Sequence, residues 1–406
     1  MRINHSGRLG LELLDDECIQ DPYPLYERMH ASGPVHPIGD SGFHAVCAWD
    51  AINDAIARPQ DFSSNLTSVM TYQDGKVGAF AMGELGGEIQ ALATADDPAH
   101  AIHRKLLVPQ FAAKRVKILE RLIHDAAEAL WDNGVHNGAI EWMSAMANRL
   151  PMMIVGRLIG LPDEDAEQLT RWGFAATKVV EGLVGQDELD RAWVATMELA
   201  GYISEHFQRA AADPKDNLLG DLAIARAAGE LGEMTALNIM ATLFSAGGES
   251  TASLIGSAAH VLAGRPDVQR QVRENPDLLG SFLEEVLRFE PPFREHYRHV
   301  VNDTTLGGVD LRAGDRLLLL WGAANRDPSH FEDPNEFRLD RPDGKGHISF
   351  GKGAHFCVGA SLARLEATIV IGELLRRTTH IAASDTGRWL PSLLVRRLER
   401  LELAVA

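Results

Sequence analysis

The sequence is poor in cysteine and in basic side chains. Its three cysteines, Cys18, Cys47 and Cys357, cannot all pair within one chain, and they are too few for a disulfide scaffold. With 39 basic against 57 acidic side chains, the formal net charge is -18. That charge opposes binding to the phosphates of nucleic acids. These shortages predict a protein of a reducing, cytoplasmic compartment that binds no nucleic acid.

Long hydrophobic segments are also missing. The longest continuous apolar run, at residues 317–324, is far shorter than the roughly 20 residues that span a bilayer. The chain start lacks the basic region, apolar stretch and small-residue cleavage site of a secretory signal. We therefore expect no export signal, no membrane anchor, and flexibility in roughly the first 15 residues.

Helical patterning dominates what is present. Apolar residues recur at helical spacing from about residue 50 to residue 288, whereas strand-like runs such as 43–47 and 316–320 are short and scattered. No repeat, low-complexity tract or Pro/Ser-rich linker divides the chain. We predict a mainly α fold with a small β part, packed as a single domain over residues 1–406. Residues 65–87 are interpreted as a loop, either a lid over an apolar pocket or plain surface.

Residues 234–264 carry a single charged side chain, that of Glu249. The uncharged runs on either side of it predict one long buried helix. An unpaired carboxylate inside such a helix is costly, so Glu249 needs a partner, a proton or a local water channel. Gly247 and Gly248 are poor helix formers. Two explanations for them remain open: a tight helix crossing, or a flat, bulky ligand that approaches the backbone.

Residues 350–359, called the Cys loop below, bring three glycines, His355 and Cys357 together directly before a helical pattern. Backbone N–H groups and the dipole at a helix start favour a thiolate, which makes Cys357 the best candidate for a metal ligand. Zinc is disfavoured because no CxxC pair exists and the other cysteines are distant in the sequence. A catalytic cysteine would not account for the three glycines of this loop. A haem iron needs one thiolate and a slim loop beneath the macrocycle.

The Cys loop resembles the signature FxxGxxxCxG of the cytochrome P450 family. The matching residues are Phe350, Gly353, Cys357 and Gly359. Further marks precede this loop in the family's order, namely the long helix with Glu249, the ExxR pair of Glu285 and Arg288, and the turn 325–328. The resemblance also implies that the arginine-bearing segment 337–341 locks the ExxR pair. An isolated ExxR is a common helical surface pair, so it is the order that carries the resemblance, which covers essentially the whole chain.

The resemblance implies a single-domain cytochrome P450 fold with small β-sheet regions and haem b between the long central helix and the Cys loop. Cys357 would be the axial ligand of the iron, and its electron-rich thiolate favours O–O cleavage. The other residues that the resemblance places at the haem are His100, Arg104, Ala246, Gly247, Arg298, Phe350, Gly351, His355 and Gly359. The basic side chains among them are the expected partners of the propionates.

Glu249 and Ser250 stand at the family's acid and alcohol positions, which relay protons to bound dioxygen. The family usually has Thr at the second position, whereas this chain has Ser250 followed by Thr251. A hydroxyl is retained, but without the methyl group that restrains its rotamer. The resemblance therefore leaves the coupling of electrons to product open.

By analogy with the family, the substrate pocket draws on residues 65–87, 172–189, 242–246, 292–296 and 393–395. The residues assigned to it are Met82, Thr242, Leu243, Phe293, Arg294 and Leu394. Most are apolar, which predicts a hydrophobic, medium-sized organic substrate. Two interpretations of Arg294 stay open: it faces the cavity and selects an acidic group, or it forms a surface or structural salt bridge.

No flavin or iron–sulfur segment is fused to the chain, so two electrons per turnover must come from another protein. The resemblance implies a ferredoxin with an NAD(P)H-dependent reductase. Basic residues that either steer this ferredoxin or are plain surface charge are Arg104, Lys105, Lys114, Arg115, Lys117, Lys352 and Arg364.

The predicted activity is that of a haem-thiolate monooxygenase, which inserts one atom of O2 into a hydrophobic small molecule. The alternatives are a peroxygenase, a haem-thiolate enzyme for isomerisation or C–C coupling, a non-catalytic haem-binding sensor and a haem-free helical binding protein. The retained Glu249 and Ser250 favour O2 activation. No coiled-coil seam is visible, so a monomer is the default expectation.

Overall fold

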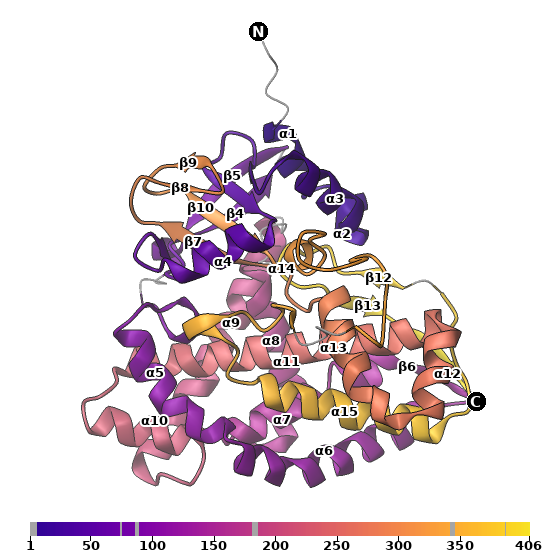
Figure 1. The fold of residues 1–406 in the computed structure, drawn as a ribbon. Coiled ribbons are helices and arrows are strands. Elements are labelled where there is room, and N and C mark those ends of the chain that lie inside the picture. Colours follow the sequence, from indigo (N-terminus) through magenta and orange to yellow (C-terminus); the bar gives the residue numbers. More distant parts are fainter. Residues whose placement is uncertain (1–5, 74, 86–88, 181–185, 342–345, 386) are drawn as a thin grey trace.

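A computed structural model describes residues 6–406 apart from 74, 86–88, 181–185, 342–345 and 386. Helices make up most of it, and the chain forms a broad helical base that narrows toward the N-terminal end (Figure 1). The helices are α1 (Ser6–Glu12), α2 (Asp16–Gln20), α3 (Tyr23–Ser32), α4 (Trp49–Ala57), α5 (Ala99–Leu107), α6 (Ala113–Gly134), α7 (Leu150–Ile159), α8 (Ala166–Lys178), α9 (Gln186–Ala212), α10 (Leu218–Ala227), α11 (Glu233–Gly264), α12 (Pro266–Glu274), α13 (Leu279–Phe289), α14 (Trp321–Ala324) and α15 (Ala360–Arg377). Within the described ranges, no helix is both long enough and apolar enough to cross a bilayer.

The strands form small sheets. The largest sheet has the order β1 (Val35–Pro37), β2 (Phe43–Val46), β10 (Arg316–Leu320), β7 (Glu295–Val300) and β3 (Phe62–Ser63). A second sheet has the order β11 (Ile381–Ala383), β14 (Glu402–Val405) and β6 (Ala139–Glu141), and the remaining pairs are β4 (Ser68–Gln73) with β5 (Lys76–Ala81), β8 (Thr304–Leu306) with β9 (Val309–Leu311), and β12 (Arg388–Trp389) with β13 (Leu398–Arg400).

The two strand-like runs of the sequence are neighbours at the centre of the largest sheet. β10 runs parallel to β2, with Arg316 opposite Phe43 and Leu319 opposite Val46. A run of buried leucines in β10 fits a central strand that is covered on both faces. The mainly α fold with small sheets is confirmed.

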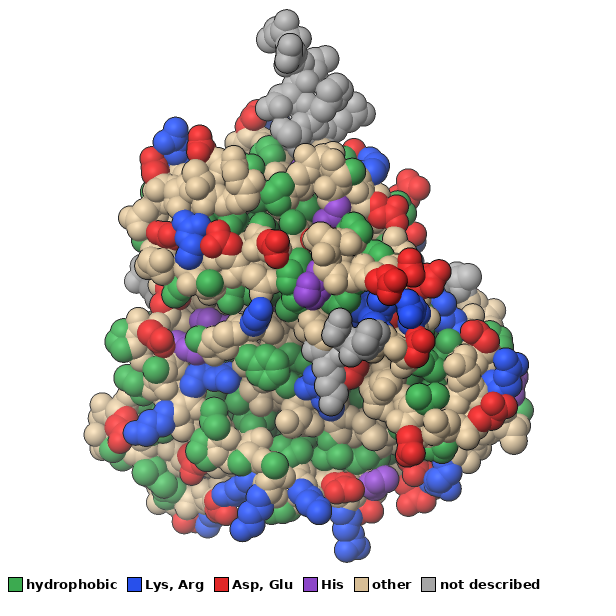
Figure 2. Space-filling view, viewed as in Figure 1, with side chains coloured by type: hydrophobic (Ala, Val, Ile, Leu, Met, Phe, Trp, Pro, Cys, Tyr) green, Lys and Arg blue, Asp and Glu red, His purple; other side chains and the backbone are tan. Residues whose placement is uncertain are grey.

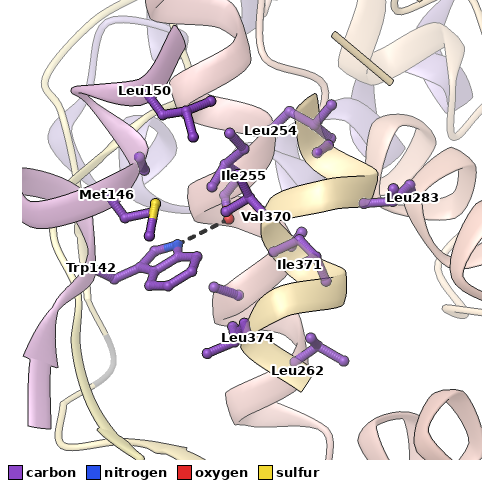
Figure 3. Close-up of a cluster of buried hydrophobic side chains, with 14 of the residues drawn as sticks. Trp142, Met146, Leu150, Leu254, Ile255, Leu262, Leu283, Val370, Ile371 and Leu374 are labelled. Carbon is purple, nitrogen blue, oxygen red and sulfur yellow. Dashed lines mark hydrogen bonds between the residues drawn. The ribbon is translucent and has the colours of Figure 1, made fainter. Parts of the chain in front are cut away.

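Helix α11 passes through the middle of the helical base (Figure 1) and confirms the prediction of one long buried helix. α15 packs beside it, and apolar side chains of both helices form the core, among them Ile255 and Val370 (Figure 3). Trp142 lies against this core, and its indole N–H donates to the Ile255 carbonyl oxygen at 3.2 Å. Because α11 is held on several sides, its pocket-facing residues have fixed positions.

Two expectations about the N-terminal part were wrong. Residues 65–87 are not simply a loop, because β4 and β5 pair as a hairpin, with Val69 opposite Phe80. Residues 74, 86 and 87 of that range lie outside the described residues. The first 15 residues are also not all flexible: α1 begins at Ser6, and Leu13 and Leu14 are buried, since this segment packs against β1. Residues 1–5 lie outside the described part.

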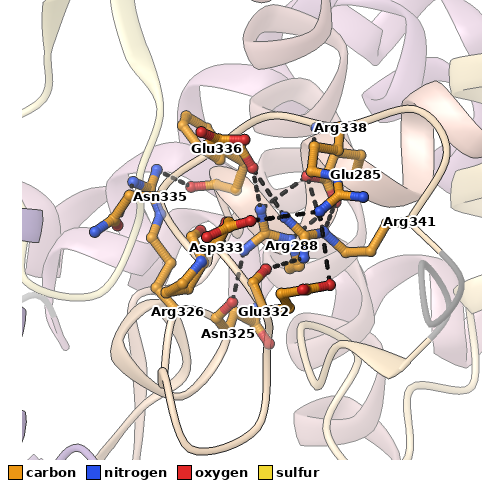
Figure 4. Close-up of polar contacts among 12 residues, drawn as sticks. Glu285, Arg288, Asn325, Arg326, Glu332, Asp333, Asn335, Glu336, Arg338 and Arg341 are labelled. Atoms are coloured by element: carbon orange, nitrogen blue, oxygen red, sulfur yellow. Dashed lines mark hydrogen bonds and ion pairs between the residues drawn. The ribbon is translucent and has the colours of Figure 1, made fainter.

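The ExxR pair forms a buried ion pair that ties α13 to the segment that precedes the Cys loop (Figure 4). Arg288 and Glu285 are 0% and 1% exposed, and the two side chains meet at 2.8 Å. The backbone N–H of Arg338 and the guanidinium of Arg341 also donate to Glu285, at 2.9 Å and 3.3 Å. The prediction that the arginine-bearing segment 337–341 locks this pair is confirmed.

A buried carboxyl group on β7 predicts a pH-dependent change in stability. Glu295 is 1% exposed, neither of its carboxyl oxygens has a hydrogen-bond partner among the described residues, and burial raises its pKa to about 8. Between about pH 5 and pH 8 the folded state holds a proton that the unfolded chain releases, so stability falls as the pH rises. We expect Glu295→Gln to raise the free energy of unfolding by about 1–3 kcal/mol at pH 8, and by little at pH 5.

Thermal unfolding of both proteins from pH 5 to pH 8 tests this expectation. The control is Glu399→Gln, which changes an exposed carboxylate and should shift the melting temperature equally little at every pH. A Glu295→Gln effect that stayed constant across this pH range would contradict the assignment of a protonated Glu295.

Candidate functional site

A pocket lies between α11, β7, α15 and the Cys loop. Its lining from α11 includes Thr242, Leu243, Ala246 and Gly247, and α5 closes another side. All ten residues that the resemblance assigned to the haem line this one pocket, namely His100, Arg104, Ala246, Gly247, Arg298, Phe350, Gly351, His355, Cys357 and Gly359. The tertiary structure thus brings together four separate stretches of the sequence, while the role of each residue remains a prediction.

The Cys loop presents Cys357 to the pocket through two tight turns. Gly351 and Gly353 both have a φ of +68°, a conformation that costs glycine little and other residues considerably more. The backbone N–H of Cys357 donates to the Phe350 carbonyl oxygen at 2.8 Å, and α15 begins three residues later at Ala360. The Cys357 side chain is therefore exposed to the pocket from a rigid loop.

The sequence predicted a lowered pKa for the Cys357 thiol, because a helix start favours the thiolate, but the net shift is upward. Burial raises the pKa of Cys357, whereas the backbone N–H of Gly359 and the guanidinium groups of Arg104 and Arg364 lower it. The helix start does favour the thiolate, but in the protein alone desolvation outweighs it. A bound metal cation removes the proton outright from a coordinating thiol, so Cys357 fits a metal-ligand role.

Four basic side chains meet at the end of the pocket beside Cys357. The rings of His100 and His355 lie 4.0 Å apart, and Arg104 donates to the Phe356 carbonyl oxygen at 2.8 Å. Burial, with neighbouring cations, lowers the pKa of His355 to about 4. Burial also lowers the pKa of Arg298 to about 10.

This basic group fits a ligand with carboxylates. Mutual repulsion and desolvation both disfavour its positive charge, and the attraction of bound carboxylates would offset both. The two propionates of a haem supply such anions next to a thiolate. The residues present therefore fit the haem that the resemblance implies.

The two glycines of α11 lie in different environments. Gly247 lines the pocket, where the missing side chain leaves room for a flat ligand. A Cβ at Gly248 would lie 2.2 Å from Sδ of Met152 on α7, so Gly248 is required by the crossing of two helices. The helix crossing is thus confirmed for Gly248, while the approach of a flat ligand to Gly247 stays a prediction.

Glu249 has a buried partner. Its carboxylate accepts a hydrogen bond from Nε of Arg397 at 3.1 Å, and it is 1% exposed. Burial raises the pKa of Glu249, and Arg397 opposes that shift. Glu249 does not line the pocket, whereas the adjacent Ser250 and Thr251 do. The acid thus lies behind the hydroxyl groups, inside the protein.

The Ser250 hydroxyl donates to the Ala246 carbonyl oxygen at 2.6 Å. This bond within α11 gives the serine a fixed rotamer although it lacks the methyl group of threonine. Thr251 is 4% exposed and lines the same pocket. Two hydroxyl groups are therefore available next to Glu249.

Half of the predicted substrate residues line the pocket. Thr242, Leu243 and Phe293 do so, whereas Met82 and Leu394 do not. Met82 follows the β4–β5 hairpin in a short 3-10 helix, away from the pocket lining. Leu394 uses its backbone carbonyl to accept the N–H of residue 294, at 2.8 Å.

Arg294 does not face the pocket, so its assignment as a substrate residue was wrong. Its guanidinium is buried and donates to the Ile19 carbonyl oxygen. Ile19 lies in the last turn of α2, where carbonyl groups lack partners within the helix. The side chain is thus structural, although it forms a hydrogen bond and not the salt bridge considered for it.

Sequence reasoning missed several lining residues. Leu92 and Ala93 lie in a short 3-10 helix that no sequence pattern marks. Glu366 lines the pocket from α15, and burial raises its pKa to about 8. Glu366 lies one helical turn after Leu362 on α15, the helix that follows the Cys loop. This spacing could have indicated that Glu366 also lines the pocket. Trp321 also lines the pocket, and no sequence pattern indicated this, whereas His296 lies in the segment 292–296 that was assigned to the substrate pocket by analogy with the family.

Comparisons with known proteins agree with this architecture. The family model described as Cytochrome P450 matches residues 186–393. The chain is 65% identical over 390 residues to Cytochrome P450 144 of Mycobacterium tuberculosis strain H37Rv, which covers 96% of this chain and 90% of that protein. It is 31% identical over 412 residues to Cytochrome P450 monooxygenase PikC of Streptomyces venezuelae, which covers 97% and 94% of the two chains.

Solved structures give the same result. P450BioI in complex with an acyl carrier protein ligated to hexadec-9Z-enoic acid is similar at a TM-score of 0.86 and 29% identity, covering 96% of this chain and 99% of that one. A cytochrome P450 from Bacillus megaterium in complex with testosterone gives a TM-score of 0.84 and 28% identity, with coverage of 96% and 99%. With these matches over nearly its whole length, the chain belongs to the cytochrome P450 family, whose members use haem and are generally haem-thiolate monooxygenases.

Proposed function

We propose that the protein is a haem b monooxygenase that takes two electrons from a separate protein and inserts one atom of O2 into a hydrophobic small molecule. The observation that carries the proposal is one pocket lined by Cys357 together with His100, Arg104, Arg298 and His355. A single thiolate and a group of carboxylate partners on an otherwise largely apolar cavity are the donor set that an iron porphyrin requires.

Residues of this chain would hold the cofactor on three sides. Cys357 would bind the iron, the basic group would bind the propionates, and Ala246 with Gly247 would leave room for the macrocycle against α11. When bound, the haem supplies the iron at which O2 is activated, with the thiolate favouring O–O cleavage. Leu243, Phe293 and their apolar neighbours would orient the substrate and exclude water.

Proton delivery is assigned to Glu249 with the hydroxyl groups of Ser250 and Thr251. Burial raises the pKa of Glu249, which favours the protonated carboxyl group relative to an ordinary one and so suits it to donate a proton. Arg397 holds one carboxylate oxygen, while the other, Oε2, has no hydrogen-bond partner among the described residues. That oxygen is free to take up and pass on a proton through water or a hydroxyl group.

A hydrophobic substrate is supported by the lining and by two related proteins. P450BioI is seen with a hexadec-9Z-enoic acid group, and the Bacillus megaterium protein with testosterone. Both are largely apolar molecules. The pocket of this chain, with Leu243 and Phe293, is suited to a ligand of the same general chemistry.

For electron supply we propose a ferredoxin with an NAD(P)H-dependent reductase, in a cytoplasmic setting that suits the buried free thiols of Cys18 and Cys47. Figure 2 shows acidic and basic side chains interspersed on one face, with several basic ones along the lower edge. Two of the seven basic residues considered for docking are already paired: Arg364 with Glu284 at 2.6 Å, and Arg115 with an aspartate of the 213–216 turn. We favour Arg104, whose guanidinium donates to the carbonyl oxygen of the exposed Phe356, with Lys105 next to it in the sequence and Lys352 in the Cys loop.

The test is the absorption spectrum of the reduced, carbon-monoxide-bound protein, compared with that of Cys357→Ser. We expect a red-shifted Soret band in the wild type and its complete loss in the variant. The control is Cys47→Ser, in which the new hydroxyl can donate to the same carbonyl oxygens that Cys47 contacts, and which should keep the band. Identical spectra from wild type and Cys357→Ser would overturn the ligand assignment.

Turnover assays separate the other candidate functions. Substrate-dependent NAD(P)H consumption with ferredoxin and reductase supports the monooxygenase. Product formation with peroxide alone favours a peroxygenase. Ligand binding without either activity favours a sensor.

A further inference from the structure

His296 lies on β7 with its ring at the pocket, in the segment 292–296 that the resemblance assigned to the substrate pocket without giving this side chain a role. The indole N–H of Trp321 donates to Nδ1 of His296 at 2.6 Å. The ring of Phe293 meets the imidazole edge to face, at 5.1 Å between centroids. The imidazole is therefore held from two sides, and both neighbours also line the pocket.

This contact fixes which nitrogen of the imidazole carries the proton. An indole nitrogen can only donate, so Nδ1 of His296 accepts and has no proton of its own. Burial, followed by the positive charges of Arg298 and His355, lowers the pKa of His296 to about 3, which keeps the ring neutral. A neutral imidazole with a bare Nδ1 has its proton on Nε2. Among the described residues, Nε2 has no hydrogen-bond partner.

We propose that His296 is a fixed hydrogen-bond donor of the pocket, and that its Nε2–H binds a carboxylate oxygen of the pocket's occupant. The inference rests on the proposed function, because the occupants in question are the haem and the substrate. His296 lies between Phe293, which contacts its ring, and Arg298 of the basic group, whose charge acts on it. The carboxylate is therefore either a haem propionate or an acidic group of the substrate.

The energetic reason is that a pocket N–H without an acceptor is unfavourable. A ligand that leaves such a donor desolvated and unpaired loses binding free energy, whereas one that supplies a carboxylate gains a charge-assisted bond. A site built around a fixed donor therefore discriminates against analogues that lack the acceptor. Unlike a histidinium, a neutral donor achieves this without adding a positive charge beside Arg298.

The experiment compares His296→Leu, which removes the donor, with His296→Gln, which keeps an N–H donor at similar reach. The control is His299→Leu on the same strand, because His299 does not line the pocket and instead contacts Thr67. One measurement is the rate of haem transfer from each holoprotein to apomyoglobin. The other is the dissociation constant of 6-phenylhexanoic acid and of hexylbenzene, from their spectral shifts.

We expect a roughly tenfold change for His296→Leu in one of the two measurements, and little change for His296→Gln and His299→Leu. Faster haem transfer identifies a propionate as the acceptor, while a lost preference for the acid over hexylbenzene identifies the substrate. If the wild type binds neither probe, haem transfer alone decides.

Changes below twofold in both measurements, or equal changes in the Leu and Gln variants, overturn the inference. Failure of the proposed function itself looks different. In that case the wild type lacks the red-shifted carbon-monoxide band before any variant of His296 is made.

Discussion

Replacing Arg288 by methionine is expected to lower the free energy of unfolding by about 3–5 kcal/mol, because it leaves the buried carboxylate of its partner without its main counter-charge. All five N–H groups of the Arg288 guanidinium are used. Two donate to Glu285 at 2.8 Å, and the other three donate to the carbonyl oxygens of Asn325, Pro334 and Glu336 at 2.8–3.0 Å. Arg288 therefore joins α13 to the chain that leads into the Cys loop.

Lysine is not a conservative replacement at this position. Its ammonium group has three donors on a flexible stem and lacks the planar fork that matches a carboxylate at two points. We expect Arg288→Lys to be destabilised as well, by about half as much, since at least two carbonyl groups lose their donor. Urea unfolding followed by circular dichroism measures both variants.

The chain contains its own control for this prediction. Glu373 and Arg376 have the same i, i+3 spacing near the end of α15, but the Arg376 side chain is 64% exposed. An exposed pair of this kind contributes about 0–1 kcal/mol, so Arg376→Met should change the free energy of unfolding by no more than that. If Arg288→Met destabilised the protein no more than Arg376→Met, the structural role assigned to the ExxR pair would be wrong.

Glu249→Gln is expected to lower the rate of product formation about 100-fold, the size of effect typical of losing a positioned acid–base group. The amide keeps the size and most of the hydrogen bonding of the carboxyl group, but it cannot take up or release a proton. Electrons should still be consumed, and the solvent kinetic isotope effect on product formation should rise. The measurement is product formed per NAD(P)H consumed, with haem content determined for each protein.

Two controls separate chemistry from folding in this experiment. Glu233→Gln changes a carboxylate in the first turn of the same helix, where its partner is Arg226 at the surface, and it should keep full activity. The carbon-monoxide spectrum and melting temperature of Glu249→Gln should stay close to those of the wild type, because Arg397 also bonds to Asn148. A product yield within twofold of the wild type would remove Glu249 from the proposed proton path.

Much of the site could be predicted because its residue types are constrained locally. The glycines of the Cys loop, the thiol of Cys357 and the start of a helical pattern all occur within eleven residues, so the sequence alone shows them together. The long uncharged stretch around Glu249 likewise has few interpretations other than a buried helix. These are the features for which the prediction and the structure agree.

Other residues could not be placed because their orientation depends on partners that are distant in the sequence. Arg294 turns to the Ile19 carbonyl oxygen instead of the pocket. The tautomer of His296 is set by Trp321, 25 residues later in the chain. Neither partner forms a pattern with its residue in the sequence, so spacing and periodicity carry no information about them.

The sequence by itself determined the mainly helical class, the long helix with its single carboxylate, and the loop that presents Cys357. Only the tertiary structure decided which polar side chains are buried and what they contact. Glu285 with Arg288 and Glu373 with Arg376 share one spacing, yet one pair is sealed inside the protein and the other lies at its surface. The physical reason is that helical periodicity sets which side chains share a face, whereas packing of remote segments sets whether that face meets protein or water.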